Sequence, residues 1–543
     1  FRQTLYEELI APRRILLHQQ VARALEEIYT NRLEEHAVEL AEHFSYSSDA
    51  ADLEKAVSYG EMAAKRATDV YAYGEAVRLL EQALKVHEIL DPDDKARRCD
   101  LLLDLCDALY LVVDTRRIIE IEAPAAFDMA ESLGDGSRAV RACIPAIFSI
   151  IVEQAMFSSP EAGEWTERIN RYAKPGTVEK VYADMVLGGW KAWTGDRKSG
   201  LAILNQALDL ARRIGDQQAL WITAGSLLLN LSEPQDIKQR MRLGEELWAG
   251  SHAGLNVVTS YALYWIIWAS LMMGRRKFAE EVLSELRTIA ERTGQITPRL
   301  MSASVDTALA VMDGCLEEAM DMAKSMRARG EEAGVSTLAH VLASPGHRAQ
   351  LYLGTSLETI GREIPLGPME EIIVPYLAQA FLGQKEEVSE ILEKNVVNRP
   401  GIGTIDDVTM VWIDTLYLEA AILAGHRQAA ELLLKRYSGT GLCSADYYVT
   451  CIPRHMGGAV ALLGRYDEAR KYYQEAIKVC TEMSFRPELA LSRLQLAELL
   501  LERYPNEKKE ALEHLDFAIK EFREMKMQPS LERALRHKDI LKA

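Results

Sequence analysis

Proline and glycine are scarce in this chain, with 17 and 33 of its 543 residues. Both residues interrupt helices, whereas the residues that dominate here (alanine, leucine, glutamate, arginine and methionine) favour them. Runs rich in valine, isoleucine and threonine at a period of two, the pattern of β-strands, are hard to find. The sequence therefore predicts an all-α protein.

The sequence also lacks the common catalytic motifs. It contains no GxxxxGK[ST] phosphate loop, no HExxH, no GxSxG, and no GxGxxG after a strand. Its eleven histidines do not pair at metal-ligand spacing, and surface or capping roles are expected for His43 and His455. We predict a non-catalytic chain without cofactor or metal. A helical (α/α)-barrel hydrolase, which needs two carboxylates across a cleft, is a remote alternative.

Cysteine is present but shows no pairing pattern. The seven cysteines are odd in number and form no CxxC, which indicates reduced thiols in a cytoplasmic protein.

The net charge of −18 disfavours direct binding to nucleic acid, because an acidic chain repels phosphate backbones.

One long stretch lacks charge altogether. Residues Ala253 to Met273 carry no charged side chain over 21 positions, which is long enough to cross a bilayer. The stretch occurs once, includes polar residues such as Asn256 and Ser270, and fits the repeat pattern below. We predict a buried repeat helix and no membrane contact. A membrane span and an exposed apolar surface are the alternatives.

What is present is an internal repeat. The clearest unit spans residues 457–480 and has small and aromatic residues at offsets 0, 7, 9, 12, 16 and 19: Gly457, Gly464, Tyr466, Ala469, Tyr473 and Ala476. Helices approach closely where facing residues are small, and a bulky residue one turn later fills the groove. This pattern resembles the tetratricopeptide repeat, a helix–turn–helix unit.

Weaker copies of the unit recur along the chain. The small residue of the second helix falls at positions 76, 123, 162, 200, 244, 279, 319, 388, 430, 469 and 511. Most steps are 35–47 residues, and one step, from 319 to 388, is 69. The resemblance implies a right-handed superhelical solenoid of about ten to twelve helix pairs.

These features predict four segments. Residues 1–45 are the helical end of a winged-helix junction, and 46–343 form the first part of the array. Residues 344–375, which hold Pro345, Pro365, Pro368 and Pro375, form an irregular interruption. Residues 376–543 complete the array.

The first helix of each tetratricopeptide pair lines the concave face, and that register yields candidate groove residues. It places seven large side chains inward: Tyr182, Trp193, Tyr261, Tyr264, Trp268, Trp412 and Arg454. Such aromatics could stack on a small ligand or hold an apolar peptide. The alternative is that they pack between adjacent repeats.

The first 90 residues resemble a specific junction. The run "FRQTLYEELIAPRRILLHQQVARALEEIY", with the "ELAEHF" helix and the repeat that follow, is similar to the point where signalling NTPases of the STAND class enter their repeat array. That class includes bacterial nucleotide cyclases and LuxR- or maltose-regulator-type transcription factors. The resemblance implies a sensor arm that binds a protein partner or small-molecule inducer and controls an NTPase domain upstream in the same polypeptide. A stand-alone scaffold for protein partners is the alternative.

Overall fold

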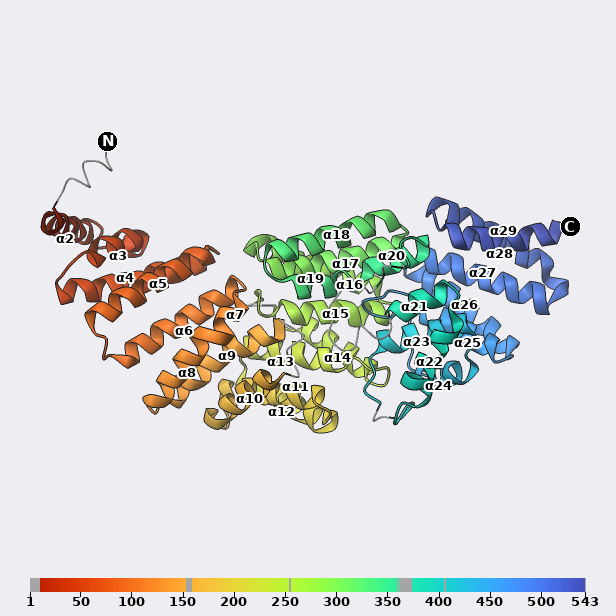
Figure 1. Ribbon diagram of the computed structural model, residues 1–543, viewed down its shortest axis with the longest axis horizontal. Helices are drawn as coiled ribbons and strands as arrows, with labels where there is room; N and C mark the ends of the chain where they lie inside the picture. The colour runs from red at the N-terminus through yellow and green to blue at the C-terminus, as the bar shows by residue number, and fades with distance from the viewer. Residues whose placement is uncertain are drawn as a thin grey trace. The chain divides into compact units, whose positions relative to one another are not determined.

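The computed structural model describes residues 10–152, 159–252, 255–358, 360, 374–404 and 407–542. Within these residues the chain is helical between short turns, and its one β-bridge joins Ser444 to Cys451. The predicted all-α helical-repeat solenoid is confirmed (Figure 1).

The chain divides into two compact units. The first comprises residues 1–214 with 293–295, and the second comprises 215–292 with 296–543. The helices of the first unit are α2 (Ala11–Ile28), α3 (Ala37–Ser45), α4 (Ala50–Asp69), α5 (Tyr73–Leu90), α6 (Lys95–Leu111), α7 (Thr115–Arg117), α8 (Ala123–Ser132), α9 (Gly136–Val152), α10 (Pro160–Tyr172), α11 (Val178–Trp193) and α12 (Arg197–Ile214).

The second unit continues the same arrangement of successive pairs. Its helices are α13 (Gln217–Asn230), α14 (Ile237–Ala249), α15 (Ser260–Met272), α16 (Arg276–Thr293), α17 (Ile296–Asp313), α18 (Leu316–Glu332), α19 (Ser336–Leu342), α20 (Pro345–Leu353), α21 (Val374–Phe381), α22 (Lys385–Leu392), α23 (Val411–Ala424), α24 (Arg427–Tyr437), α25 (Ile452–Leu462), α26 (Tyr466–Glu482), α27 (Arg486–Arg503), α28 (Lys508–Glu524) and α29 (Gln528–Lys542).

Close helix crossings occur where the sequence places small residues. A Cβ atom added to Gly457 would lie 2.6 Å from the Tyr473 ring, and one added to Gly200 would lie 2.5 Å from the Gly188 carbonyl oxygen. Real Cβ atoms cannot approach that closely, so these crossings require glycine. Gly464 ends α25 with a φ of +84°, the left-handed turn expected at that position.

Short polar residues begin several helices. The side chains of Asp49, Asp94 and Asp216 accept hydrogen bonds from backbone N–H groups in the first turns of α4, α6 and α13. These caps satisfy donors that the helix itself leaves unpaired. They fix where each repeat starts after its turn.

The first and second helices of the repeats differ in how many of their residues are buried. Every residue of α15 is buried except Tyr261, and α23 is buried from Val411 to Ala421. By contrast, α26 buries only Ala469, Tyr473, Ala476 and Cys480. In the second unit these first helices therefore form an inner layer that is packed on all sides, and second helices such as α26 face solvent.

The uncharged stretch 253–273 is confirmed as a buried repeat helix over α15, and residues 253–254 lie outside the described residues. No helix in the described part of the chain is long and apolar enough to cross a membrane. The predicted interruption at 344–375 opens with an ordered helix, α20, and its residues 361–373 lie outside the described residues. All seven cysteines are described, and none forms a disulfide.

Ion pairs link neighbouring repeats. Arginines bind carboxylates that lie 35 to 38 residues away in sequence, about one repeat, as in Arg138–Asp100, Arg141–Asp104, Arg276–Asp313 and Arg470–Glu507. The acidic residues are therefore not only solvated faces or neighbours along one helix. Many of them hold one repeat against the next.

Candidate functional site

Two regions on the first helices of the pairs are candidates for function. One is a hollow between α4 and α6 in the first unit, and the other is the interior of the second unit. The sequence analysis directed attention mainly to the second.

The interior of the second unit is occupied by a segment of the chain itself. Residues 442–451, between α24 and α25, are buried at every position except Cys443, which is half-buried. We call them the inner segment. The Cys443 N–H donates to the Met272 carbonyl at 2.7 Å, and the Ser444 hydroxyl donates to the Leu271 carbonyl at 3.0 Å. The inner segment is thus fixed to the end of α15.

Three of the predicted groove residues surround this segment. Trp268 stacks on Tyr447 with ring centroids 6.0 Å apart, and Tyr264 meets Trp268 edge to face at 6.1 Å. Trp412 meets Tyr447 edge-on and stacks on Tyr448 at 5.7 Å. These side chains are buried, so a ligand could touch them only if the inner segment moved away.

Arg454, a fourth predicted residue, belongs to a buried charge cluster. Its Nε donates to Glu488 at 2.5 Å, while Arg348 binds Glu419 at 2.7 Å. Thr450 of the inner segment donates to Glu488 at 2.9 Å. Although burial opposes ionisation of Glu488, Arg454 lowers the pKa of that carboxyl, so the pair stays charged.

His455 corrects one sequence prediction. It was expected at the surface or in a capping role, but it is buried and lies 2.7 Å from the Thr450 hydroxyl. Burial, followed by the charges of Arg454 and Arg348, lowers the pKa of His455, so the ring is neutral. The adjacent arginine in the sequence gave no sign of this burial, because the cluster joins α20, α23, α25 and α27.

The other three predicted residues lie apart from the cluster. Tyr182 is buried in the first unit, where its ring meets Phe148 edge-on at 5.9 Å. Trp193 is half-buried at the end of α11, and Tyr261 is half-buried at the start of α15. Ligand binding by all seven residues stays a prediction.

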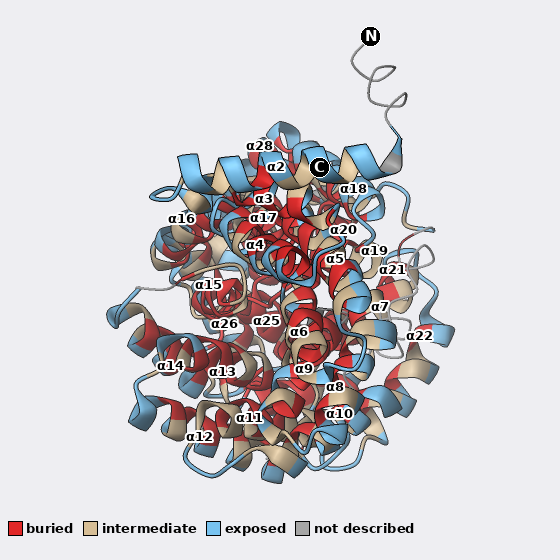
Figure 2. Cartoon of the chain, turned by 90° about the vertical axis from the view of Figure 1, so that its left-hand side faces the viewer, coloured by how far each residue is buried: buried red, intermediate tan, exposed pale blue. Residues whose placement is uncertain are grey.

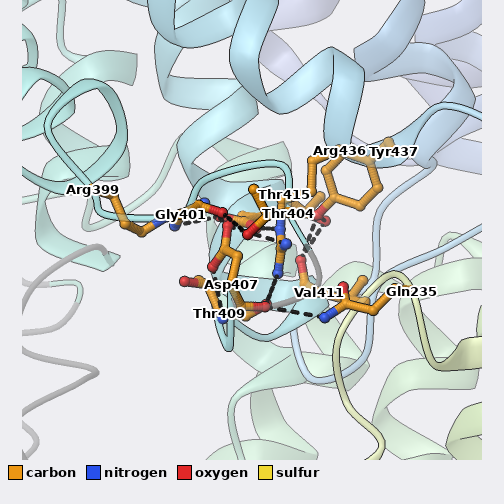
Figure 3. A network of polar contacts seen from close by, with 11 residues as sticks. Gln235, Arg399, Gly401, Thr404, Asp407, Thr409, Val411, Thr415, Arg436 and Tyr437 are labelled. Carbon is orange, nitrogen blue, oxygen red and sulfur yellow. Dashed lines mark hydrogen bonds and ion pairs between the residues drawn. The ribbon is translucent and has the colours of Figure 1, made fainter.

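A second buried polar network closes the loop before α23 (Figure 3). Arg436 binds the carboxylates of Asp407 and Asp414, and its guanidinium also donates to the Thr409 carbonyl at 2.6 Å. Gln235, from the turn before α14, donates to the Asp407 carbonyl at 3.1 Å. The network joins the described residues of the loop, 407–410, to the turn before α14 and to helices α23 and α24.

A third polar contact anchors the inner segment directly. The guanidinium of Arg240 on α14 lies 3.7 Å from the Asp446 carboxylate, and both side chains are at most 1% exposed. Arg240 also lies over the Trp265 ring, 5.3 Å from its centroid. Burial raises the pKa of Asp446 and lowers the pKa of Arg240, while each group stabilises the charged form of the other. Removing Asp446 would leave Arg240 buried without this partner, which is costly.

The burial of the inner segment was not predicted from the sequence. Its letters "LCSADYYVTC" combine two tyrosines with valine and threonine, a short extended signal between two helical repeats. That signal could have marked an extended stretch, but it could not have shown that the stretch lies inside the unit.

The hollow in the first unit has a different character. It encloses about 430 Å³ between α4 and α6, with Leu80 of α5 at its base. Its walls carry both apolar and charged side chains: Glu61, Met62, Ala64, Lys65, Thr68, Asp69, Asp104, Asp107, Ala108 and Leu111. A volume of this size is typical of sites that take a small ligand or one side chain of a partner.

The charges in the hollow are only partly neutralised. Arg141 on α9 binds Asp104 at 2.5 Å and Asp107 at 2.9 Å, and Arg97 binds Glu61. Loss of water raises the pKa of Glu61 and of Asp107 despite these arginines. The Asp107 side chain is 53% exposed, so its pKa reflects enclosure by the walls of the hollow and not complete burial.

No group of three or more potential metal ligands occurs among the residues that the structure describes. The hollow therefore offers ion pairs, hydrogen bonds and an apolar base, which suit recognition.

Comparison with known proteins agrees with the repeat architecture. A family model described as the tetratricopeptide repeat matches residues 448–520. That range begins in the inner segment and covers the clearest repeat of the sequence. No curated protein matches the chain.

Solved structures give distant likenesses. The crystal structure of the APC/C hetero-tetramer Cut9–Hcn1 is 12% identical over 95% of this chain and 96% of that chain, with a TM-score of 0.43. The structure of Naa15/Naa10 bound to HypK-THB is 12% identical over 96% of this chain and 92% of that chain, with a TM-score of 0.18. At these identities and scores the likeness says nothing about function. By the match over residues 448–520 and by the helix pairs that recur in both units, the chain is a tetratricopeptide-like helical repeat protein.

Proposed function

We propose that this chain is a protein-interaction scaffold that receives its partner in the hollow between α4 and α6. The observation that supports this site is the open volume of about 430 Å³ on the first helices of two consecutive repeats. Repeat proteins use the surface formed by such helices for binding. In the second unit, residues 442–451 of the chain itself pack against α15.

The chemistry of the hollow favours a segment of a partner with both a basic and an apolar side chain. Asp69, Asp104 and Asp107 would attract the cation, and Met62 and Leu111 would contact the apolar group. A small-molecule inducer of the same character is compatible with the volume.

We further propose that the scaffold is the sensor arm of a larger signalling NTPase. The support is the resemblance of the first 90 residues to the junction of STAND-class proteins. A stand-alone scaffold accounts equally well for the repeats. The full reading frame discriminates between them: a phosphate-loop domain encoded upstream favours the sensor arm, and its absence favours the stand-alone scaffold.

Site-specific photo-cross-linking in the native host tests the binding site. A benzoylphenylalanine in place of Thr68 would project from the wall of the hollow, and the same residue in place of Lys85, an exposed position of α5, serves as the matched control. We expect discrete adducts from position 68, weakened by a Leu111→Arg substitution that fills the hollow. Identical adduct patterns from both positions, or none from position 68, would reject the proposal.

A further inference from the structure

The first and the last described helices differ in which side chains they expose to solvent. Most of the exposed residues of the last described helix, α29, are charged: Glu532, Arg533, Arg536 and Asp539. The first described helix, α2, lacks this character.

Apolar side chains on α2 face solvent. Among the described residues, seven of the seventeen exposed large hydrophobic side chains fall between positions 10 and 46: Ile10, Leu16, Leu17, Val21, Ile28, Val38 and Tyr46. Ile10 and Ile28 are each 70% exposed, and Leu17 and Val21 are each 40% exposed. Figure 2 shows α2 coloured almost entirely as exposed or intermediate.

Four of these residues, Ile10, Leu17, Val21 and Ile28, lie on one seam of α2 together with Arg14 and Ala24. Positions 10, 14, 17, 21, 24 and 28 alternate steps of four and three, the spacing that keeps side chains on one line of a coiled-coil helix. The other side of α2 is already occupied, since His18 contacts His43 and Gln19 binds Ser47 of the next repeat. The seam, defined by these six positions, is therefore a separate face, and it is exposed at every position except the half-buried Arg14.

The seam is symmetric about its own centre. If a second α2 lay antiparallel across it, Ile10 would face Ile28, and Leu17 would face Val21 of the second copy. The long side chain of Arg14 would lie over the small Ala24. Every position of the seam thus finds a partner of suitable size in an identical helix, which is the property of an isologous interface.

The charges beside the seam have the same symmetry. Arg13 and Glu27 flank it at opposite ends, both are exposed, and neither takes part in any ion pair found among the described residues. In an antiparallel pair each Arg13 meets Glu27 of the second copy, so two equivalent ion pairs form. Parallel pairing would instead place Arg14 beside Arg14 within the seam, and this repulsion between like charges disfavours it.

We propose that the seam of α2 is a homodimer interface, in which two copies of this chain pair antiparallel through residues 10–28. The contact is independent of the partner-binding hollow. Each helix of 18 residues is about 27 Å long. An interface of this size is small, so the association is weak and depends on protein concentration.

Sedimentation velocity of the full chain over about 1–100 μM, the range expected for a small interface, tests this proposal. We expect wild-type protein to shift from monomer to dimer within that range. Leu17→Glu places a carboxylate in the middle of the seam and should abolish the shift. A circular dichroism spectrum equal to that of the wild type would show that the variant still folds.

Variants with reversed charges test whether Arg13 meets Glu27 of the second copy. Arg13→Glu or Glu27→Arg alone sets like charges opposite each other twice per dimer and should raise the Kd by about threefold to tenfold. The double variant exchanges both charges and should restore the wild-type Kd. Arg536→Glu on α29 is the matched control and should have no effect. A wild-type monomer throughout, or a double variant as weak as the single ones, would overturn the proposal.

Discussion

The inner faces of the two units differ although both are built from the same kind of helix pair. In the first unit, α4 and α6 leave a hollow with charged walls. In the second, α15 and α23 are buried on every side because residues 442–451 lie against them. The comparison teaches that a repeat pattern specifies the helix pairs but does not decide whether their inner face stays open. One extended segment between two repeats is sufficient to fill it.

The largest expected effect comes from removing the charge that anchors the inner segment. Asp446→Ala would leave Arg240 buried without its partner, at a cost of about 3–5 kcal/mol in the free energy of unfolding. Asp104→Ala in the hollow breaks a half-exposed pair and should cost at most about 1 kcal/mol. Urea unfolding, with hydrogen exchange of the α15 amides to localise the loss, measures both.

The double variant Arg240→Met, Asp446→Leu is the control for that loss. It removes both charges together and should recover most of the stability, because apolar residues of similar volume replace a buried ion pair well. Equal losses for Asp446→Ala and Asp104→Ala would show that the two inner faces do not differ as the structure indicates.

A second, smaller effect concerns pH. His347 of α20 is buried, its Nδ1 lies 3.4 Å from the Tyr448 hydroxyl of the inner segment, and burial lowers its pKa to about 4. The unfolded chain takes up a proton near the ordinary pKa of 6.5, but the folded chain does not. Stability therefore falls as the pH drops below about 6.5, by about 2 kcal/mol from this group between pH 7 and 5.

His347→Gln keeps a polar side chain at this position but cannot take up the proton. Its unfolding free energy should lose about 2 kcal/mol less than that of the wild type between pH 7 and 5. His455, whose pKa burial also lowers, contributes in the same direction in both proteins. An unchanged pH dependence in the variant would exclude His347 as a source of acid sensitivity in the second unit.

The smallest expected change in the free energy of unfolding comes from a substitution in the hollow of the first unit. Lys65 projects from α4 into the hollow with 80% of its side chain exposed, so Lys65→Ser should change the unfolding free energy by no more than about 0.5 kcal/mol. The same substitution should alter the adducts obtained from a cross-linker at position 68. A large loss of stability without any change in the adducts would show that the hollow serves packing alone.

Much of the fold could be predicted from the sequence because its rules are local. The spacing of Gly457 and Tyr473 predicted a close helix crossing, which occurs, and Gly464 between them takes the left-handed conformation that suits a glycine after a helix. These outcomes depend on residues within about 20 positions of one another, so the pattern is visible in a single repeat. The uncharged stretch around Tyr264 was correctly interpreted as a buried helix for the same reason.

The surroundings of the candidate residues could not be predicted in this way. Trp268 and Trp412 lie 144 residues apart, and they share Tyr447 as a neighbour only because three distant elements meet. The hollow likewise depends on the space that α4, α5 and α6 leave among residues of all three helices. The spacing of Glu61 and Asp104 in the sequence does not show whether the space between their helices is open or filled by other side chains.

By itself, the sequence determined that the protein is helical, that its helices come in pairs of about one repeat length, and where small residues let those pairs cross. These properties follow from helix propensity and local sterics. Only the tertiary structure decided that residues 442–451 fill the interior of the second unit, that Arg240 and Asp446 meet there, and that α2 leaves its apolar seam uncovered. Whether a residue is buried depends on its contacts with segments that are distant in the sequence, so a local sequence pattern cannot predict it.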